Sequence, residues 1–396
     1  MHKKISVGLC ITCVILSMAI AAAVTVPVTL FVINNKIGNL SKRQVITAKI
    51  EEIDAKVRAN FLYDIDDAEL IDSIAEGYMK GLEDDYAAYF DNDDYSDKIQ
   101  TGKGYTDGIG IEIAKHPDSG KVTVLYVDKN SPANKSGIKK GDVITHINDT
   151  DIKDKSVSEC VEMIGNEIGK SFKLTLSRGD TVLNVNAAIA EYEADTVRYQ
   201  ALESIGYIKI TKFNQSTPKQ FEEAIKYLNE KKVSALIFDL RDNLGGDVAA
   251  LVAVMDDILP SGDLIKLKYK NGETKVTEKS DSNEISLPMA VLVNANSASC
   301  SEIFAMNIRD YKKGKLIGTK TYGKGIVQST YELTDKTAIK FTVATVVDKN
   351  GVSYHGVGLT PDVEVKLNDE QQRLAAFLNF ETDPQYKAAV SAVTRR

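Results

Sequence analysis

The sequence predicts a multidomain protein of mixed α/β and α+β structure. Three observations carry this prediction: an uncharged stretch between Lys4 and Lys36, β-branched runs that begin after residue 104, and strands that alternate with helices after residue 204. A chain of 396 residues is long enough for two or three domains. We therefore expect a transmembrane anchor (1–36), a helical region (37–103), a small β module (104–190), an α/β core (191–366) and a helical C-terminal tail (367–396).

The first segment predicts a membrane anchor. No charged residue occurs between Lys4 and Lys36, and a run of this length can cross a hydrocarbon core about 30 Å thick. A cleaved signal peptide is the alternative, because Ala19-Ile20-Ala21 fits a cleavage site. The apolar run continues past that site to Ile33, which favours an uncleaved anchor.

The region from Ser41 to Gln100 is predicted to be largely helical. Ile46, Ile50, Ile53 and Val57 repeat at three- and four-residue steps, which is typical of an amphipathic helix and suggests self-association. A second helix is expected over Ala68–Leu82. The acidic stretch Glu83–Asp97 that follows is interpreted as a solvated loop.

The next segment has the pattern of a compact β module. Val122–Val127 and Phe172–Leu176 are apolar or alternating runs typical of strands, and Gly141-Asp142 predicts a turn. Ser156–Ile164 predicts a short helix that Ser156 or Ser158 caps.

From Tyr207 onward the chain alternates strands and helices. Strands are predicted at Tyr207–Ile210, Ala235–Leu240, Ala290–Val293 and Leu316–Ile317, and helices at Thr217–Glu230, Val248–Leu259 and Ser301–Arg309. This alternation indicates a layered α/β fold, whose sites usually lie at the carboxyl ends of the strands.

Composition excludes several classes of function. The chain has 49 Lys+Arg against 56 Asp+Glu, a mildly acidic balance that argues against a nucleic-acid partner. Its four cysteines and four histidines lack the spacing of metal ligands, so we expect no metal and no cofactor.

Two segments that follow predicted strands carry candidate chemistry. In the first, Gly245 and Gly246 lead into a helix, so their N–H groups are free to face an incoming oxygen; a tight turn is the simpler interpretation. The second places Ser297, Ser299 and Ser301 in alternation between a strand and a helix. A helix cap accounts for one of these serines but not for three. The alternative is a nucleophile on a sharp turn.

A serine nucleophile needs a base, and two candidates are present. Lys324 lies between Gly323 and Gly325, just before an apolar run, and His355 follows later in the chain. A lysine base must be uncharged, which burial beside apolar residues promotes. Gln328 is placed to orient the amine. A lysine in a hairpin turn is the structural alternative.

These segments resemble those of the carboxyl-terminal processing proteases, a family of Ser–Lys peptidases. The resemblance is carried by Ser297-Ala298-Ser299-Cys300-Ser301-Glu302-Ile303, by Thr321-Tyr322-Gly323-Lys324-Gly325 and by Gly356-Val357-Gly358-Leu359-Thr360-Pro361-Asp362. It implies that Ser299 is the nucleophile, Lys324 the base and Gln328 its partner. It also implies an oxyanion hole formed by the N–H of Cys300 and that of Gly245 or Gly246. Cys300 departs from the usual alanine, which suggests sensitivity to oxidation or alkylation.

The β module resembles a PDZ domain. Asp107-Gly108-Ile109-Gly110-Ile111 is similar to the carboxylate-binding loop, and Ser131 to Ile144 to the stretch after it. The resemblance implies that the N–H groups of Gly108, Ile109, Gly110 and Ile111 bind a terminal carboxylate while the peptide adds as a strand.

The sequence as a whole predicts a membrane-anchored serine endopeptidase with its body outside the cytoplasm. Its expected partners are proteins with apolar C-terminal tails. Two other hypotheses remain at this level: a serine hydrolase with His355 as base, and a tethered adaptor that binds tails without cleaving them.

Overall fold

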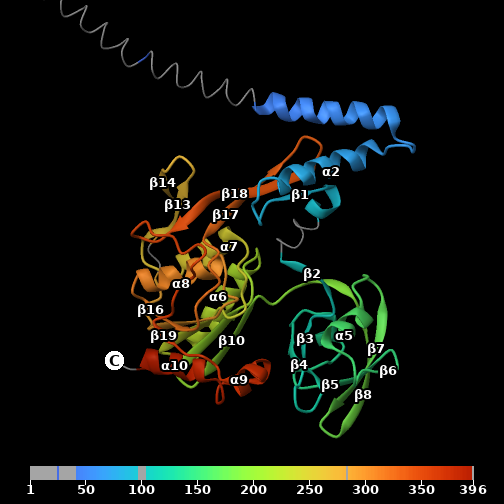
Figure 1. Cartoon of the computed structure of the whole chain (residues 1–396). Coiled ribbons are helices and arrows are strands. Elements are labelled where there is room, and N and C mark those ends of the chain that lie inside the picture. Colours follow the sequence, from blue (N-terminus) through green and yellow to red (C-terminus); the bar gives the residue numbers. More distant parts are fainter. Residues whose placement is uncertain (1–24, 26–41, 97–103, 282–283, 395–396) are drawn as a thin grey trace, which may run out of the picture. The chain divides into compact units, whose positions relative to one another are not determined.

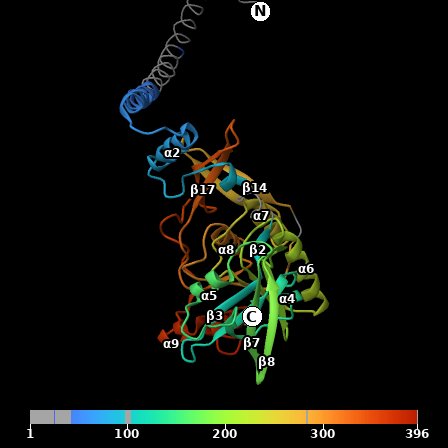
Figure 2. The ribbon, with the colours of Figure 1, turned by 90° about the vertical axis from the view of Figure 1, so that its right-hand side faces the viewer.

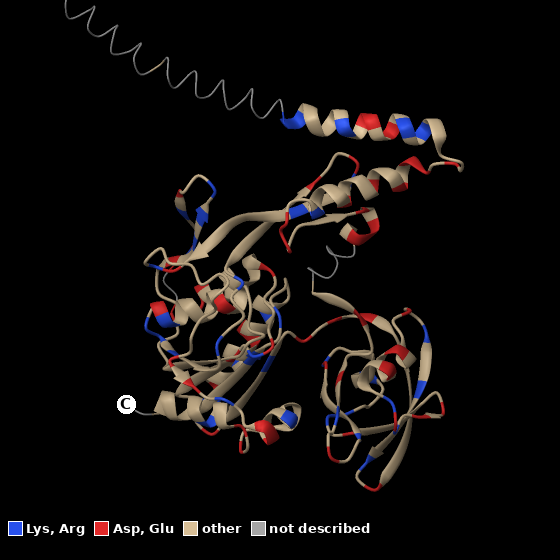
Figure 3. Cartoon of the chain, viewed as in Figure 1, with Lys and Arg blue, Asp and Glu red and all other residues tan. Residues whose placement is uncertain are grey.

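The computed structural model describes residues 25, 42–96, 104–281 and 284–394. They form two compact units that divide between Ile74 and Ala75. In the first unit residues 42–60 are helical, and α2 (Asp67–Lys80) begins there. Figure 3 shows acidic and basic residues interspersed along the helix at 42–60, where Lys49 pairs with Glu52 and Arg58 with Asp54. Its apolar face, which includes Val45 and Ile53, is exposed.

The predicted anchor lies almost wholly outside the described residues. Within the ranges that the structure describes, no helix combines the length and the apolarity needed to span a bilayer.

The small β module has its own core of 15 buried apolar side chains, because alternate residues of its strands point inward. One sheet has the order β3-β4-β5-β7-β8 with β6 on β5, and β2 pairs with β9. Its helices are α4 (Pro132–Lys135) and α5 (Val157–Ile164); Ser156 caps α5 as predicted, and α5 lies beside β3 (Figure 2). The strands are β2 (Tyr105–Gly108), β3 (Ile111–Lys115), β4 (Val122–Val127), β5 (Val143–Ile147), β6 (Thr150–Asp151), β7 (Ser171–Arg178), β8 (Thr181–Ala188) and β9 (Ala190–Glu193).

The α/β core is built on a six-stranded sheet of order β10-β11-β12-β15-β16-β19. All neighbours pair in parallel except β10 and β11. The strands are β10 (Val197–Leu202), β11 (Ile205–Ile210), β12 (Ala235–Asp239), β15 (Met289–Val293), β16 (Gly314–Gly318) and β19 (Val363–Glu364).

Helices cover both faces of this sheet (Figure 1). Leu236 and Phe238 pack with α6 (Thr217–Glu230), α7 (Val248–Asp256) and α8 (Cys300–Asp310), whereas Ile237 packs with α10 (Pro384–Thr394) on the opposite face. The period of two along β12 thus produces three layers. Two short helices, α9 (Asp369–Arg373) and η1 (Ala375–Phe377), precede α10.

A second sheet holds one wall of the site. Its order is β1-β18-β13-β14, with β17 also on β18. The strands are β1 (Ala88–Phe90), β13 (Gly262–Tyr269), β14 (Thr274–Ser280), β17 (Ile326–Glu332) and β18 (Ala338–Val347). The interpretation of Glu83–Asp97 as a solvated loop was wrong for part of this stretch, because β1 pairs with β18, about 250 residues later in the chain.

Candidate active site

Ser299 occupies a strained turn between β15 and α8. Its φ is 57° and its ψ is −118°, a conformation that residues other than glycine rarely adopt. Ser297 and Ser301 are fully buried, and their hydroxyls donate to the carbonyl oxygens of Leu240 and Asn243 at 2.8 and 2.9 Å. Ser297 and Ser301 therefore bind this turn (the serine turn) to residues 240–246 (the glycine loop). Ser299 is the half-exposed member of the three.

The buried Glu302 joins the serine turn to residues 321–325, the segment that contains Lys324 (the lysine loop). One of its oxygens accepts from the backbone N–H groups of Ser299 (3.0 Å) and Lys324 (2.8 Å). The other accepts from the Thr321 hydroxyl (2.5 Å) and the Gly323 N–H (2.7 Å). Four donors on a side chain with no exposed surface fix the separation of the two candidate catalytic segments.

Glu302→Gln is expected to separate these segments, because an amide replaces one acceptor oxygen with a donor. We predict a loss of about 2–4 kcal/mol in unfolding free energy and an activity loss on the order of 100-fold, measured by thermal unfolding and peptide cleavage. Glu159→Gln is the matched control, since Glu159 accepts from the Ser156 N–H in the same way but at the exposed start of α5. Equal effects of the two substitutions would contradict the role of Glu302.

The glycine loop packs directly on the serine turn. A side chain at Gly245 would bring its Cβ to 2.8 Å from the Cβ of Ser299 and 3.0 Å from the Cys300 nitrogen. The N–H of Gly245 donates to Asn243 Oδ1 at 2.8 Å. Among the backbone carbonyls of the described residues, none accepts from the N–H groups of Gly246 and Cys300. Of the predicted oxyanion donors, Gly246 and Cys300 are thus the two whose N–H groups have no backbone acceptor in the described chain.

Gly245→Ala is expected to displace Ser299 and abolish cleavage, because the new methyl group has no room and the φ of 102° is strained. Gly272→Ala is a matched control: its φ is 83°, but no atom lies within 4 Å of the added Cβ. The control should lose about 1 kcal/mol of stability and keep its activity. Active Gly245→Ala protein would show that the close approach is unimportant.

Cys300 is sealed from solvent. Its thiol is fully buried and donates to the Gly246 carbonyl at 3.3 Å, and burial raises its pKa to about 12. A thiol in this state is inert, so the expected sensitivity to oxidation or alkylation is not supported.

Lys324 is half-buried in the loop between β16 and β17. Burial lowers the pKa of its amine, and Lys340 lowers it further. The amine lies 4.3 Å from the centre of the Tyr86 ring. Ser299 and Lys324 are both described, and no hydrogen bond joins the Ser299 hydroxyl to the Lys324 amine in this arrangement.

Gln328 and His355 flank the lysine loop. The Gln328 amide donates to the Thr342 hydroxyl at 3.2 Å, and Asp84 accepts from the Thr342 N–H at 2.8 Å. The exposed His355 contacts the Gly323 carbonyl through Nδ1 at 3.2 Å. Since a carbonyl oxygen only accepts, this nitrogen carries the proton.

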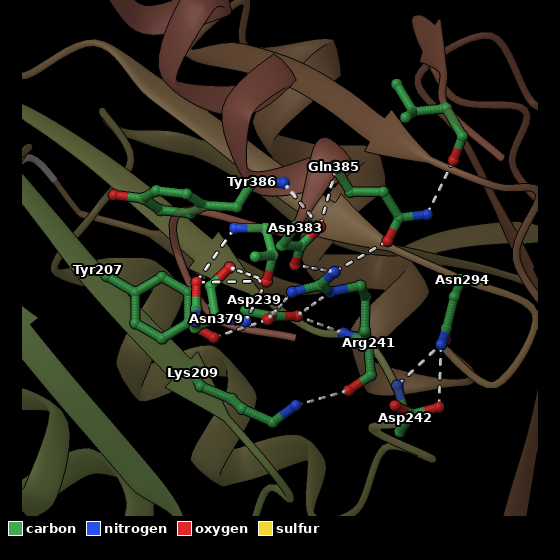
Figure 4. Close-up of polar contacts among 12 residues, drawn as sticks. Tyr207, Lys209, Asp239, Arg241, Asp242, Asn294, Asn379, Asp383, Gln385 and Tyr386 are labelled. Carbon is green, nitrogen blue, oxygen red and sulfur yellow. Dashed lines mark hydrogen bonds and ion pairs between the residues drawn. The ribbon is translucent and has the colours of Figure 1, made fainter. Parts of the chain in front are cut away.

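A buried ionic network surrounds Arg241, which precedes Gly245 and Gly246 in the chain (Figure 4). Arg241 donates to Asp239 and, through Nη1, to Asp383 (2.7 Å) and Gln385 (2.8 Å) at the start of α10. Tyr207 also donates to Asp239, at 2.7 Å. Burial opposes the charge on Asp239, but Arg241 and Lys209 hold its pKa below the ordinary value. The C-terminal helix thereby contributes to the position of the glycine loop.

Sequence reasoning did not single out this network, Glu302 as a link, or Asp84 and Tyr86. The Asp-Leu-Arg run beside the glycine pair was the signal available for the network. Asp84 and Tyr86 gave no signal, because they lie far from the site in sequence.

The predicted carboxylate loop of the small module lies between β2 and β3. The Ile109 and Gly110 carbonyls accept from Ala133 and Asp128, and no described residue accepts from the N–H groups of Ile109 and Gly110. A side chain at Gly110 would bring its Cβ to 2.1 Å from Ser131. The carbonyls of Ile109 and Gly110 thus fix the loop, and their N–H groups remain available to bind a carboxylate.

A strained serine beside free backbone donors and a half-buried amine defines the core as a serine-type hydrolase. The family model "Peptidase family S41" matches residues 204–365, and "PDZ domain" matches residues 108–189. The carboxy-terminal processing protease CtpA of Bacillus subtilis (strain 168) is 30% identical over 381 residues, which are 93% of this chain and 79% of that protein.

Three further proteins agree with this result. A probable CtpA-like serine protease of Staphylococcus aureus (strain MSSA476) is 30% identical over 353 residues, 88% of this chain and 71% of that protein. The solved structure of the photosystem II D1 C-terminal processing protease has a TM-score of 0.50 and 25% identity, covering 77% of this chain and 84% of that one. A putative S41 protease from Bacteroides fragilis NCTC 9343 shares the fold, with a TM-score of 0.59, 18% identity and coverage of 81% and 90%.

The chain therefore belongs to peptidase family S41 and is a serine-type carboxy-terminal processing protease with a PDZ domain.

Proposed function

We propose that Ser299 and Lys324 form a Ser–Lys dyad that hydrolyses peptide bonds in proteins delivered by the PDZ domain through their C-terminal tails. The observation that carries this proposal is the Glu302 link, which ties the backbone of the strained serine to that of the lysine. The pKa of the amine is lowered by burial, as a neutral base requires.

The reaction follows from these groups. The neutral Lys324 amine takes the Ser299 hydroxyl proton as the oxygen attacks the peptide carbonyl carbon. Backbone donors at Cys300 and Gly246 stabilise the oxyanion of the tetrahedral intermediate. The lysine ammonium then protonates the departing amine, and the neutral amine later activates the water that releases the acyl group.

We propose that the C-terminal tail of the substrate binds between β3 and α5. The free N–H groups of Ile109 and Gly110 support binding of a terminal carboxylate, and Gly108 and Ile111 flank them. On α5, Val161 is exposed and Val157 is half-buried, so both are available to an apolar tail, whereas Ile164 belongs to the module's core.

The dyad is tested by three variants assayed on an unstructured polypeptide with an apolar tail. Ser299→Ala and Lys324→Ala should each abolish cleavage, by a factor of about 10³ or more, because nucleophile and base act as a unit. His355→Ala should cleave at a rate close to that of the unmodified chain. Activity that survives loss of Lys324 but not of His355 would make the histidine the base.

We also propose that residues 1–36 anchor the chain in the membrane with its body on the extracytoplasmic side, and that the helix at 42–60 mediates self-association. The uncharged run from Ile5 to Ile33 and the exposed apolar face of the helix support this. The full-length chain should sediment with membranes, be digested by protease added to spheroplasts, and cross-link to a dimer through residues 42–60. Recovery in the soluble fraction would contradict the anchor, and protection from protease would contradict its orientation. Detection of only a monomer after cross-linking would contradict the self-association.

A further inference from the structure

The Lys324 amine is engaged by an aromatic ring. Its nitrogen lies 4.3 Å from the centre of the Tyr86 ring, within the range of a cation–π contact, and it makes no hydrogen bond to Ser299. Tyr86 comes from the segment before β1, which sequence analysis assigned to solvent. Glu302 thus links the backbones of Ser299 and Lys324, but the hydrogen bond that proton transfer between their side chains requires is not formed.

Two sets of contacts fix the Tyr86 ring in place. On one side, the Tyr86 N–H donates to Asp84 Oδ1 at 3.0 Å, and Asp84 also accepts from the Thr342 N–H and hydroxyl. On the other side, the Tyr86 hydroxyl is near Tyr322: burial and then the neighbouring Tyr322 raise the pKa of Tyr86. Tyr322 lies two residues before Lys324 and its side chain is exposed. The Tyr86 segment is therefore bound to β18, where Thr342 accepts from Gln328, and the Tyr86 ring lies next to the lysine loop.

An aromatic face favours the charged form of this base. The negative face of the ring attracts an ammonium group and gains little from a neutral amine. The other groups near the amine are Lys340 from β18, Asp84 from the segment before β1, and Cys300 from α8. Burial and Lys340 favour the neutral amine, whereas Tyr86 and Asp84 favour the ammonium. Tyr86 therefore competes with Ser299 for the lysine.

We propose that Tyr86 is a positioning residue that holds the Lys324 amine in a resting place apart from Ser299, and that the amine must leave the ring before Ser299 is activated. This inference rests on the proposed Ser–Lys dyad. It assigns to the segment before β1 a direct influence on the base, in addition to its contact with Thr342.

The test measures the rate at which a fluorophosphonate labels Ser299 in the full-length chain between pH 6 and pH 10. Tyr86→Leu removes the aromatic face and keeps an apolar side chain. The rise of its labelling rate with pH (the labelling limb) should shift to lower pH by about half a unit. Labelling at neutral pH is then about threefold faster. Tyr86→Phe keeps the face and should retain the original limb. Tyr331→Leu is the control for loss of a tyrosine from the neighbouring sheet, where Tyr331 stacks on Phe341, and should also retain it.

Slower labelling, or an unchanged limb, in folded Tyr86→Leu protein would overturn the inference. Should that variant not fold, Tyr322→Phe serves instead, because it releases the ring through an exposed residue; it should shift the limb in the same direction, and an unshifted limb would again overturn the inference. Ser299→Ala separates the two claims. Labelling that persists in Ser299→Ala would contradict the dyad itself, whereas its loss together with an unshifted Tyr86→Leu limb would remove only the role of Tyr86.

Discussion

The site depends on one buried carboxylate. Glu302 lies in the first turn of α8 and receives four hydrogen bonds, from the serine turn on one side and the lysine loop on the other. A carboxylate without exposed surface is costly unless all its acceptor positions are used, so the loops cannot separate without a large penalty. The Thr321 hydroxyl that donates to Glu302 also accepts from the Leu359 N–H, which brings the Gly356–Asp362 segment into the same network.

Other contacts position the glycine loop and the serine turn around Glu302. Ser297 and Ser301 fix the glycine loop to the turn, and Asn243 orients that loop from within by donating to the Ile210 carbonyl and accepting from Gly245. Arg241 extends the support to α10. The strained φ of Ser299 persists because its neighbours on both sides are anchored.

Sequence patterns predicted the α/β core well, because each element buries a regular stripe. The helix predicted at Thr217–Glu230 has those bounds in the structure, and the strand predicted at Ala235–Leu240 ends one residue earlier. Ser299 was singled out from an alternation of serines that a helix cap alone did not explain. Glu302 resembled an ordinary acidic residue in a first helical turn, and its four donors come partly from a loop about 20 residues away. Asp84 and Tyr86 were missed because an acidic, turn-rich stretch has no periodicity that reveals a partner 258 residues later.

The central claim is that Glu302 keeps the serine and the lysine in one frame while the lysine amine reaches the serine oxygen. A crystal structure of the full-length chain with Ser299 phosphonylated tests it most directly. The account predicts the Lys324 amine within about 3.2 Å of the Ser299 oxygen, with the contacts of Glu302 to both segments retained. An amine that still lies over the Tyr86 ring, or a Glu302 that has released either segment, would contradict it.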